Sequence, residues 1–303
     1  MKVSALLSFT ACGFGLVLCG CGGGSAPASA KPAANALAGN WLIVGPMPTN
    51  GIQFPPPPSG FRLAMTFDVT GNNVVAGGFG SNFCDNVQSG FEFGSAVAVA
   101  GTVAADGSFT LATPTSSPLA TISIKGMVPQ ASGEPWSGSY AVSLGGHAPV
   151  CDTNLSGTFT ATSFPLISGV YVGTGSTLAG PNGVSAAAPV TFQVTLQQGG
   201  MVTNPGNGAS STFFSNAVLT GSIKVQGSPC FSSGVTSARP SSAVLGNTVS
   251  ASFLMDDGST LSLLGSLTDT TEGHIATNLV LVTGGNCGGI SNVIQLSGLD
   301  RQS

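Results

Sequence analysis

The segment FRLAMTFDVT, residues 61–70, decides the fold because apolar and polar side chains alternate along it. A period of two is typical of an antiparallel strand with one buried face and one face in water. No stretch beyond residue 36 keeps a helical period over three turns, so the sequence predicts an all-β protein. The apolar face of this strand holds Phe61, Leu63, Met65, Phe67 and Val69.

Part of this strand returns later in the chain: TFDVT at 66–70 matches TFQVT at 191–195. Further landmarks recur in the same order, which predicts two copies of one unit, residues 37–165 and 166–303. The other matches are GNW at 39–41 with GVY at 169–171, DGS at 106–108 with 257–259, LSG at 155–157 with 296–298, and one Cys between the TFxVT strand and DGS and another shortly before LSG in each half.

Each unit contains enough short alternating runs for about eight strands. Asp106-Gly107 and Asp257-Gly258 lie between such runs and predict two-residue hairpin turns of type I′. Eight antiparallel strands in about 130 residues indicate a small up-and-down barrel or a sandwich. In the first unit the strands are expected at 38–45, 61–70, 73–79, 95–104, 108–113, 120–128, 136–144 and 155–163.

The N-terminus has the pattern of an export signal. Residues 1–20 hold one Lys and an apolar run from Ala5 to Leu18, too short for a membrane-spanning helix. The run ends in Leu18-Cys19-Gly20-Cys21, which resembles the lipobox of bacterial lipoproteins. The resemblance implies that residues 1–20 are a signal peptide and that Cys21 is the lipid attachment site. Cys19 is the weaker acceptor because Leu18 would stand before it, and an ordinary signal peptide is the alternative.

Residues 21–36 are rich in Gly, Ala, Ser and Pro, which predicts a flexible tether. The lipobox resemblance implies a palmitate-bearing protein anchored in a membrane of the cell envelope. Gly22 and Gly23 lack the Asp that retains enteric lipoproteins at the inner membrane, so the outer membrane is expected, facing the periplasm or the surface. Lipobox, tether and paired Gly/Thr/Ser-rich units together resemble uncharacterised lipoproteins of environmental Gram-negative bacteria.

The start of the first unit, Gly39-x-Trp41, resembles the start of lipocalins. That resemblance implies a barrel. If the interior is open, it also implies a carrier of a small apolar ligand with Phe61, Met65 and Phe67 around the cavity.

Charges are sparse and place limits on the partners. Charged residues make up 6% of the chain, with a formal net charge of −4. Loss of Lys2 with the signal leaves six basic against eleven acidic residues, or −5. With no basic patch, nucleic acid and anionic lipid surfaces are not expected as partners. An envelope protein, a glycan or a small apolar ligand fits this composition.

The cysteines agree with an oxidising compartment. Of seven, four remain after the signal and the lipid attachment site are set aside, and an even number predicts disulfides. The chain has no C-x-x-C pair and no His at ligand spacing, so no zinc site is expected. The repeat favours pairing within units, with a cross-unit pairing as the alternative. Pairing within units joins Cys84 to Cys151 and Cys230 to Cys287.

Catalytic signatures are weak throughout. There is no G-x-S-x-G motif, and the two histidines, His147 and His274, do not recur at matching positions. Asp256-Asp257-Gly258 leads straight into a predicted strand without the further oxygens that calcium needs. We therefore predict no catalytic residue, no metal and no cofactor. The leading hypothesis is a structural or binding role in the envelope. The alternatives are a surface or periplasmic hydrolase with a loop-built site and a lipocalin-like carrier.

Overall fold

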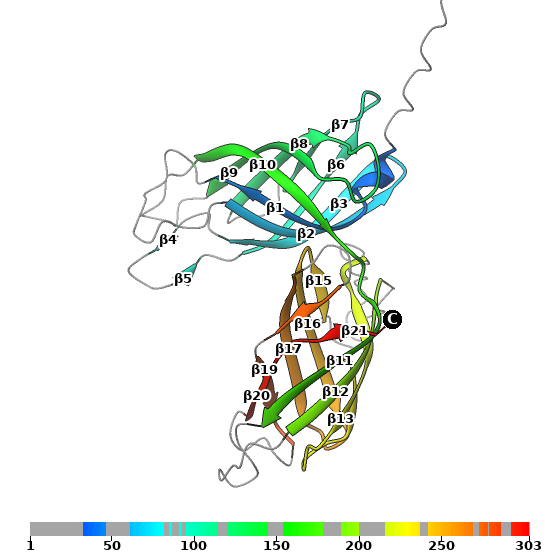
Figure 1. Ribbon diagram of the computed structural model, residues 1–303. Helices are drawn as coiled ribbons and strands as arrows, with labels where there is room; N and C mark the ends of the chain where they lie inside the picture. Colours follow the sequence, from blue (N-terminus) through cyan, green and yellow to red (C-terminus); the bar gives the residue numbers. More distant parts are fainter. Residues whose placement is uncertain are drawn as a thin grey trace, which may run out of the picture. The chain divides into compact units, whose positions relative to one another are not determined.

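Antiparallel strands make up most of the described residues and close into two eight-stranded barrels in tandem (Figure 1). This confirms the predicted all-β class, and it selects barrels over sandwiches. Residues 31–303 cluster as one compact unit. The computed structural model describes residues 33–46, 61–81, 85–86, 91–92, 95–113, 120–144, 154–177, 189–199, 216–236, 242–268, 273–277, 279–285 and 292–302.

Barrel 1 is an up-and-down barrel in which each strand of the ring pairs with the next one along the chain. It closes where β1 pairs with β10, with Asn40 opposite Phe164. A two-stranded hairpin, β4 (Asp85–Asn86) and β5 (Phe91–Glu92), lies between β3 and β6. The expected strand ends lie within two residues of the observed ones. The ring consists of β1 (Gly39–Gly45), β2 (Phe61–Thr70), β3 (Asn73–Ser81), β6 (Ser95–Val103), β7 (Ser108–Ala112), β8 (Ala120–Met127), β9 (Trp136–Leu144) and β10 (Asn154–Phe164).

The interior of barrel 1 is built around the Trp136 ring. Trp41, Phe67, Phe109 and Phe159 meet this ring edge to face, with ring centroids 5.1 to 6.2 Å away. Such edge-to-face pairs suit the positive edge and negative face of aromatic rings. The described interior at this level is therefore filled by side chains.

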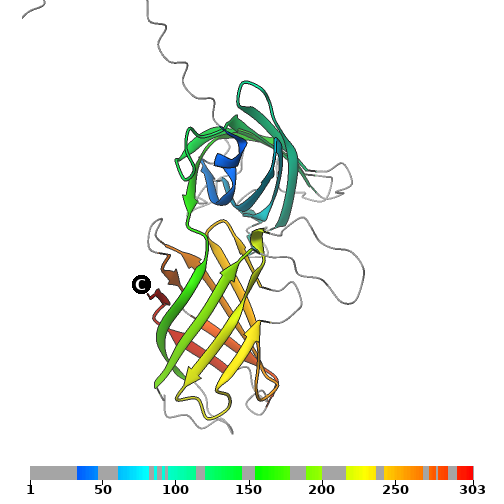
Figure 2. The same cartoon turned by 90° about the vertical axis from the view of Figure 1, so that its right-hand side faces the viewer.

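A short 3-10 helix, η1 (Ala34–Leu37), lies inside the ring of barrel 1 (Figure 2). Ala34, Ala36 and Leu37 are buried with the barrel core, and the Trp41 indole donates a 2.7 Å hydrogen bond to the Leu37 carbonyl. The tether expected at 21–36 therefore extends too far along the chain, because its last residues pack in barrel 1. Alanines have no alternation that would reveal this burial in the sequence.

Barrel 2 closes through the pairing of β16 with β17. Two short strands, β15 (Ala243–Leu245) and β18 (Ile275–Ala276), pair with one end of β16 and of β17, respectively. A third, β21 (Asp300–Arg301), pairs with β11. The ring consists of β11 (Ser168–Thr177), β12 (Pro189–Gln198), β13 (Leu219–Gln226), β14 (Ser233–Thr236), β16 (Thr248–Met255), β17 (Thr260–Leu267), β19 (Leu279–Thr283) and β20 (Asn292–Leu296).

Most of the described apolar residues in the strands of barrel 2 point inward, as the alternation predicts. In β12, Val190, Phe192, Val194 and Leu196 are buried, while the residues between them are half-buried or exposed. The described core holds aliphatic side chains with Phe192, Phe253 and Tyr171 among them. The transfer of these side chains from water is the main stabilising contribution.

The two DGS turns differ from the expected two-residue type. Ala104 pairs with Ser108 and Met255 with Ser259, so each loop has three residues. In each loop Gly takes a positive φ (88° at Gly107), and the preceding Asp accepts hydrogen bonds from the Ser backbone and hydroxyl. The Asp side chain stabilises this wider loop, and the DG pair alone does not reveal its length.

The repeat holds at the level of strands but not of every landmark. Gly39 and Gly169 begin equivalent strands with φ of 117° and 126°. Phe67, however, lies opposite Gly39, whereas Leu196 and not Phe192 lies opposite Gly169. The TFxVT segments are thus shifted by four residues, an even shift that keeps the same face buried. The DGS loops also join different strands, the fourth and fifth of barrel 1 but the fifth and sixth of barrel 2.

Candidate functional site

Most of the cysteines and one histidine singled out in the sequence lie outside the described residues. These are Cys21, Cys84, Cys151, Cys287 and His147. Cys230 is described and is disulfide-bonded. Its partner is outside the described part, so the pairing with Cys287 stays a prediction. The predicted pairs do share one topology, because in each barrel the two cysteines fall between the third and fourth and between the seventh and eighth strands.

His274 has an acidic partner. Its Nδ1 lies 2.5 Å from Asp300 Oδ1, which ties β21 to the segment before β18. Burial raises the pKa of the nearby Tyr171 phenol, an effect that the Arg301 charge partly offsets, so this phenol is not a base at neutral pH.

The two carboxylates of the second DGS loop form hydrogen bonds within the loop and with the start of β14. Asp256 accepts hydrogen bonds from the backbone and hydroxyl groups of Ser232 and Ser233, and these bonds lower the pKa of its carboxyl group. Asp257 accepts from Ser259. No group of three metal-ligating residues is found in the described part of the chain. The geometry gives both carboxylates a structural role.

The lipocalin-like hypothesis depends on the interior of barrel 1. Met65 and Phe67 are fully buried, and Phe67 packs against Trp136. The Phe61 side chain lies outside the described residues. At the level of Phe67 the described side chains pack against one another.

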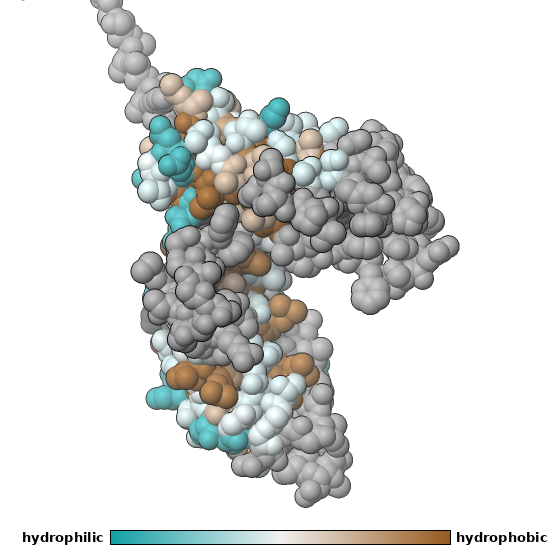
Figure 3. Space-filling view, turned by 180° about the vertical axis from the view of Figure 1, so that it is seen from behind, coloured by the Kyte–Doolittle hydropathy of each residue, from teal (hydrophilic) through white to brown (hydrophobic). Residues whose placement is uncertain are grey.

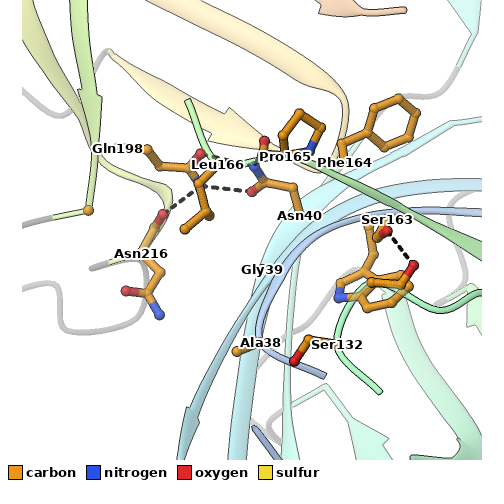
Figure 4. A pocket seen from close by; sticks show the side chains of 13 residues that line it. Ala38, Gly39, Asn40, Ser132, Ser163, Phe164, Pro165, Leu166, Gln198 and Asn216 are labelled. Atoms are coloured by element: carbon orange, nitrogen blue, oxygen red, sulfur yellow. Dashed lines mark hydrogen bonds between the residues drawn. The ribbon is translucent and has the colours of Figure 1, made fainter. Parts of the chain in front are cut away.

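Two amide side chains meet where the barrels join, at a place the sequence did not indicate (Figure 4). Asn40 on β1 and Gln198 on β12 are only 1% and 6% exposed. Asn40 Nδ2 donates to Gln198 Oε1 at 2.9 Å, and Gln198 Nε2 donates to Asn40 Oδ1 at 2.7 Å. Each amide thus satisfies the other where water does not reach, as buried polar groups require.

Backbone groups complete the hydrogen bonding of this amide pair. Asn40 Nδ2 also donates to the Pro165 carbonyl and Gln198 Nε2 to the Asn216 carbonyl, while the Ile167 amide donates to Gln198 Oε1, at 2.8 to 3.1 Å. Pro165 and Ile167 belong to the segment between the barrels. The pair therefore fixes the chain as it passes from one barrel to the next.

The turn between β15 and β16 makes a second contact between the barrels. Thr66, on the outer face of β2, is buried with its hydroxyl 2.7 Å from the Val244 carbonyl and 2.9 Å from Asn40 Oδ1. It accepts a hydrogen bond from the Gly246 amide at 3.3 Å. Arg62 donates to Asn247 Oδ1 at 3.0 Å. We call this set, with the amide pair, the seam.

Gly246 is the closest point of approach in the seam. Its φ is +58°, and a Cβ atom there would lie 2.4 Å from the Trp41 carbonyl oxygen and 2.7 Å from the Met65 nitrogen. Only glycine fits, both for its backbone conformation and for its lack of a side chain. The barrel 2 turn thus rests directly on the backbone of β1 and β2.

A surface pocket of about 420 Å³ opens beside the seam. Its described lining includes Gly39, Ser132, Leu166 and Asn216 as well as the amide pair, and no charged residue (Figure 4). Asn40 and Gln198 are already hydrogen-bonded to each other. The pocket therefore offers a neutral, mainly apolar surface, as many ligand-binding pockets do.

Sequence reasoning missed the seam for two reasons. Gln198, in phase with the buried residues of β12, ends that strand as a lone polar residue, and Asn40 and Thr66 occupy outward positions of alternating strands. Polar residues there are expected to face water, and here they face another barrel. The only available signal was Gly246 beside Asn247, a turn pair between apolar residues, which says nothing about what covers it.

Comparisons with known proteins give no family and no relative for this chain. The chain matches no protein-family model, no curated protein and no solved structure. In the described part of the chain, no helix has the length and apolar character needed to span a membrane.

Proposed function

We propose that this protein is a lipoprotein of the cell envelope, attached to the membrane by lipid at Cys21, with a structural or binding role and no catalytic one. Attachment rests on the lipobox-like Leu18–Cys21 and on the Gly-rich residues that follow it. Several acyl chains on one cysteine give stable anchoring that a single chain does not. The tether then separates the membrane from a double barrel that begins at η1.

The observation that carries the non-catalytic role is the seam. Its buried amides and the Thr66 hydroxyl form hydrogen bonds between the two barrels, so these polar groups act as a joint. The neutral pocket beside it is where a glycan or small apolar ligand would bind. An envelope protein is the other partner class that the uncharged surface favours.

The outer membrane, facing the periplasm or the surface, is the proposed location. This location rests on positions 22 and 23, which are both Gly, whereas enteric lipoproteins retained at the inner membrane have Asp after the lipid-bearing Cys. A hydrolase is the alternative, and a fluorophosphonate probe separates the two proposals for a serine nucleophile. We expect no labelling of the native chain by this probe.

Growth with labelled palmitate tests the anchor. We expect the chain to carry label and to fractionate with membranes, and Cys21→Ala to abolish both. Cys19→Ala is the matched control and should keep the label, because it leaves Gly20 and Cys21 intact. Label that survives Cys21→Ala would refute the assignment.

A further inference from the structure

One outer side of barrel 2 carries large exposed apolar residues among its serines and threonines. Four of the large exposed apolar residues lie on neighbouring strands β14, β16, β17 and β19, and Leu264 and Leu254 are 64% and 53% exposed. Apolar brown side chains appear among paler ones on the surface of barrel 2 in Figure 3. We call this set the leucine face: Val235, Leu254, Leu264 and Leu281.

The register arranges the leucine face as a pattern of large and small side chains. Leu254 lies opposite Thr260, and Leu264 lies opposite Ser250. Between these two rows, Ser252 and Ser262 lie opposite each other with their hydroxyls 3.3 Å apart. The face therefore has small side chains at its centre and one leucine on each side of them.

Such a pattern complements itself. If a second copy is turned by a two-fold axis through the Ser252–Ser262 centre, in the plane of the face and across the strands, β16 lies over β16. Leu254 of each copy then faces Ser250 of the other, and Leu264 faces Thr260. At these positions large side chains thus meet small ones, as close packing between two sheets about 10 Å apart requires. Leu281, which lies level with Ser262, meets Leu281 of the other copy across the axis.

Charge favours the same arrangement. The described outward positions of β14, β16, β17 and β19 are Ser, Thr, Val and Leu, so the face holds no charge that would have to be desolvated. Asp256 and Asp257 lie in the turn at one end of the face. An axis across the strands places these turns at opposite ends of the dimer, so the carboxylates do not repel each other.

We propose that the leucine face is an interface with a second copy of this chain. These strands are half of an eight-stranded ring, so a second copy meets the two central strands and the near flanks of their neighbours. A width of about three strands, each about 4.8 Å apart with about 3.4 Å per residue, gives a face of roughly 400 Å². Two copies then bury roughly 800 Å², below the usual lower bound for a stable interface. The dimer is therefore weak in dilute solution, and confinement to a membrane would favour it by raising the local concentration.

Site-specific photo-cross-linking in cells that export the full chain tests the proposal. Benzoylphenylalanine at Leu281 should give a light-dependent product of twice the chain's mass. Mass spectrometry of this product should find only this chain. The matched control position is the exposed Thr195 on β12, across the ring from β17, and it should give no such product.

A second substitution on the face measures how much the interface contributes to dimer formation. Leu264→Asp with the probe at Leu281 should reduce the dimer at least tenfold, whereas Met127→Asp, at a 51% exposed apolar residue of barrel 1, should not. If Leu264→Asp does not fold, Leu264→Ser replaces it with the same expected direction. A product containing another protein or lipid, or no product at Leu281, would overturn the proposal.

Discussion

At the scale of single residues, Gly246 is the turn position at which barrel 2 contacts the backbone of β1 and β2. Gly246→Ala would combine a backbone strain of ~1–2 kcal/mol with an overpacking cost of ~1–3 kcal/mol, because the new Cβ would collide with the backbone of β1 and β2. We expect a loss of about 2–5 kcal/mol in the free energy of unfolding, measured by urea denaturation.

Gly258→Ala is the control for this prediction. Gly258 also has a positive φ, +82°, but nothing lies within 4 Å of the position of its Cβ. It should therefore lose only the ~1–2 kcal/mol of backbone strain. Equal losses at the two glycines would mean that the turn does not rest on barrel 1.

Asp256 makes a pH-dependent contribution. Hydrogen bonds from Ser232 and Ser233 hold the pKa of its carboxyl below the ordinary value of 3.8. A lowered pKa stabilises the fold above the ordinary value, and this stabilisation is lost as the pH falls through the lowered value. Asp256→Asn should be less stable than the native chain at pH 7, and the gap should narrow below about pH 4.

Thermal unfolding between pH 2 and pH 7 measures this gap. Ser232→Ala should have little further effect in the Asp256→Asn background, because the two residues act through one set of hydrogen bonds. A gap between Asp256→Asn and the native chain that stays constant across the whole pH range would contradict the assignment.

At the scale of elements, alternation predicted the strands well because burial on one side of a sheet imposes a period of two. The strand 61–70 has its predicted bounds. Alternation could not fix register, since any even shift buries the same face, and the TFxVT segments differ by such a shift. It also could not show what covers an outward residue. Asn40 and Thr66 therefore resembled surface positions, and the candidate site stayed hidden.

The amide pair itself is testable by a double-mutant cycle. Asn40→Ala or Gln198→Ala leaves a buried amide without its partner, so each should cost about 1–3 kcal/mol. The double variant should lose less than the sum of the two single variants. The exposed neighbour Gln197 is the control, and Gln197→Ala should change stability by no more than about 0.5 kcal/mol. Strict additivity would show that the amides do not act as a pair.

At the scale of the whole molecule, the question is whether the seam makes two barrels into one unit. Each barrel closes its own sheet and fills its own core, so neither needs the other for its strand pairing. The coupling must then come from the seam: the amide pair, the Thr66 hydroxyl and the Gly246 contact. A rigid double barrel would hold the neutral pocket and the leucine face in a fixed relation, which suits a binding or structural role.

The positions of the tryptophans allow this coupling to be measured. Both tryptophans of the chain, Trp41 and Trp136, lie in barrel 1, so their fluorescence reports on that barrel, whereas circular dichroism reports on the strands of both. With the disulfides intact, the two urea transitions of the native chain should coincide, as in a cooperative unit. Gly246→Ala should separate them, because it breaks the contact without touching either core. Transitions that are already separate in the native chain would show that the seam does not couple the barrels.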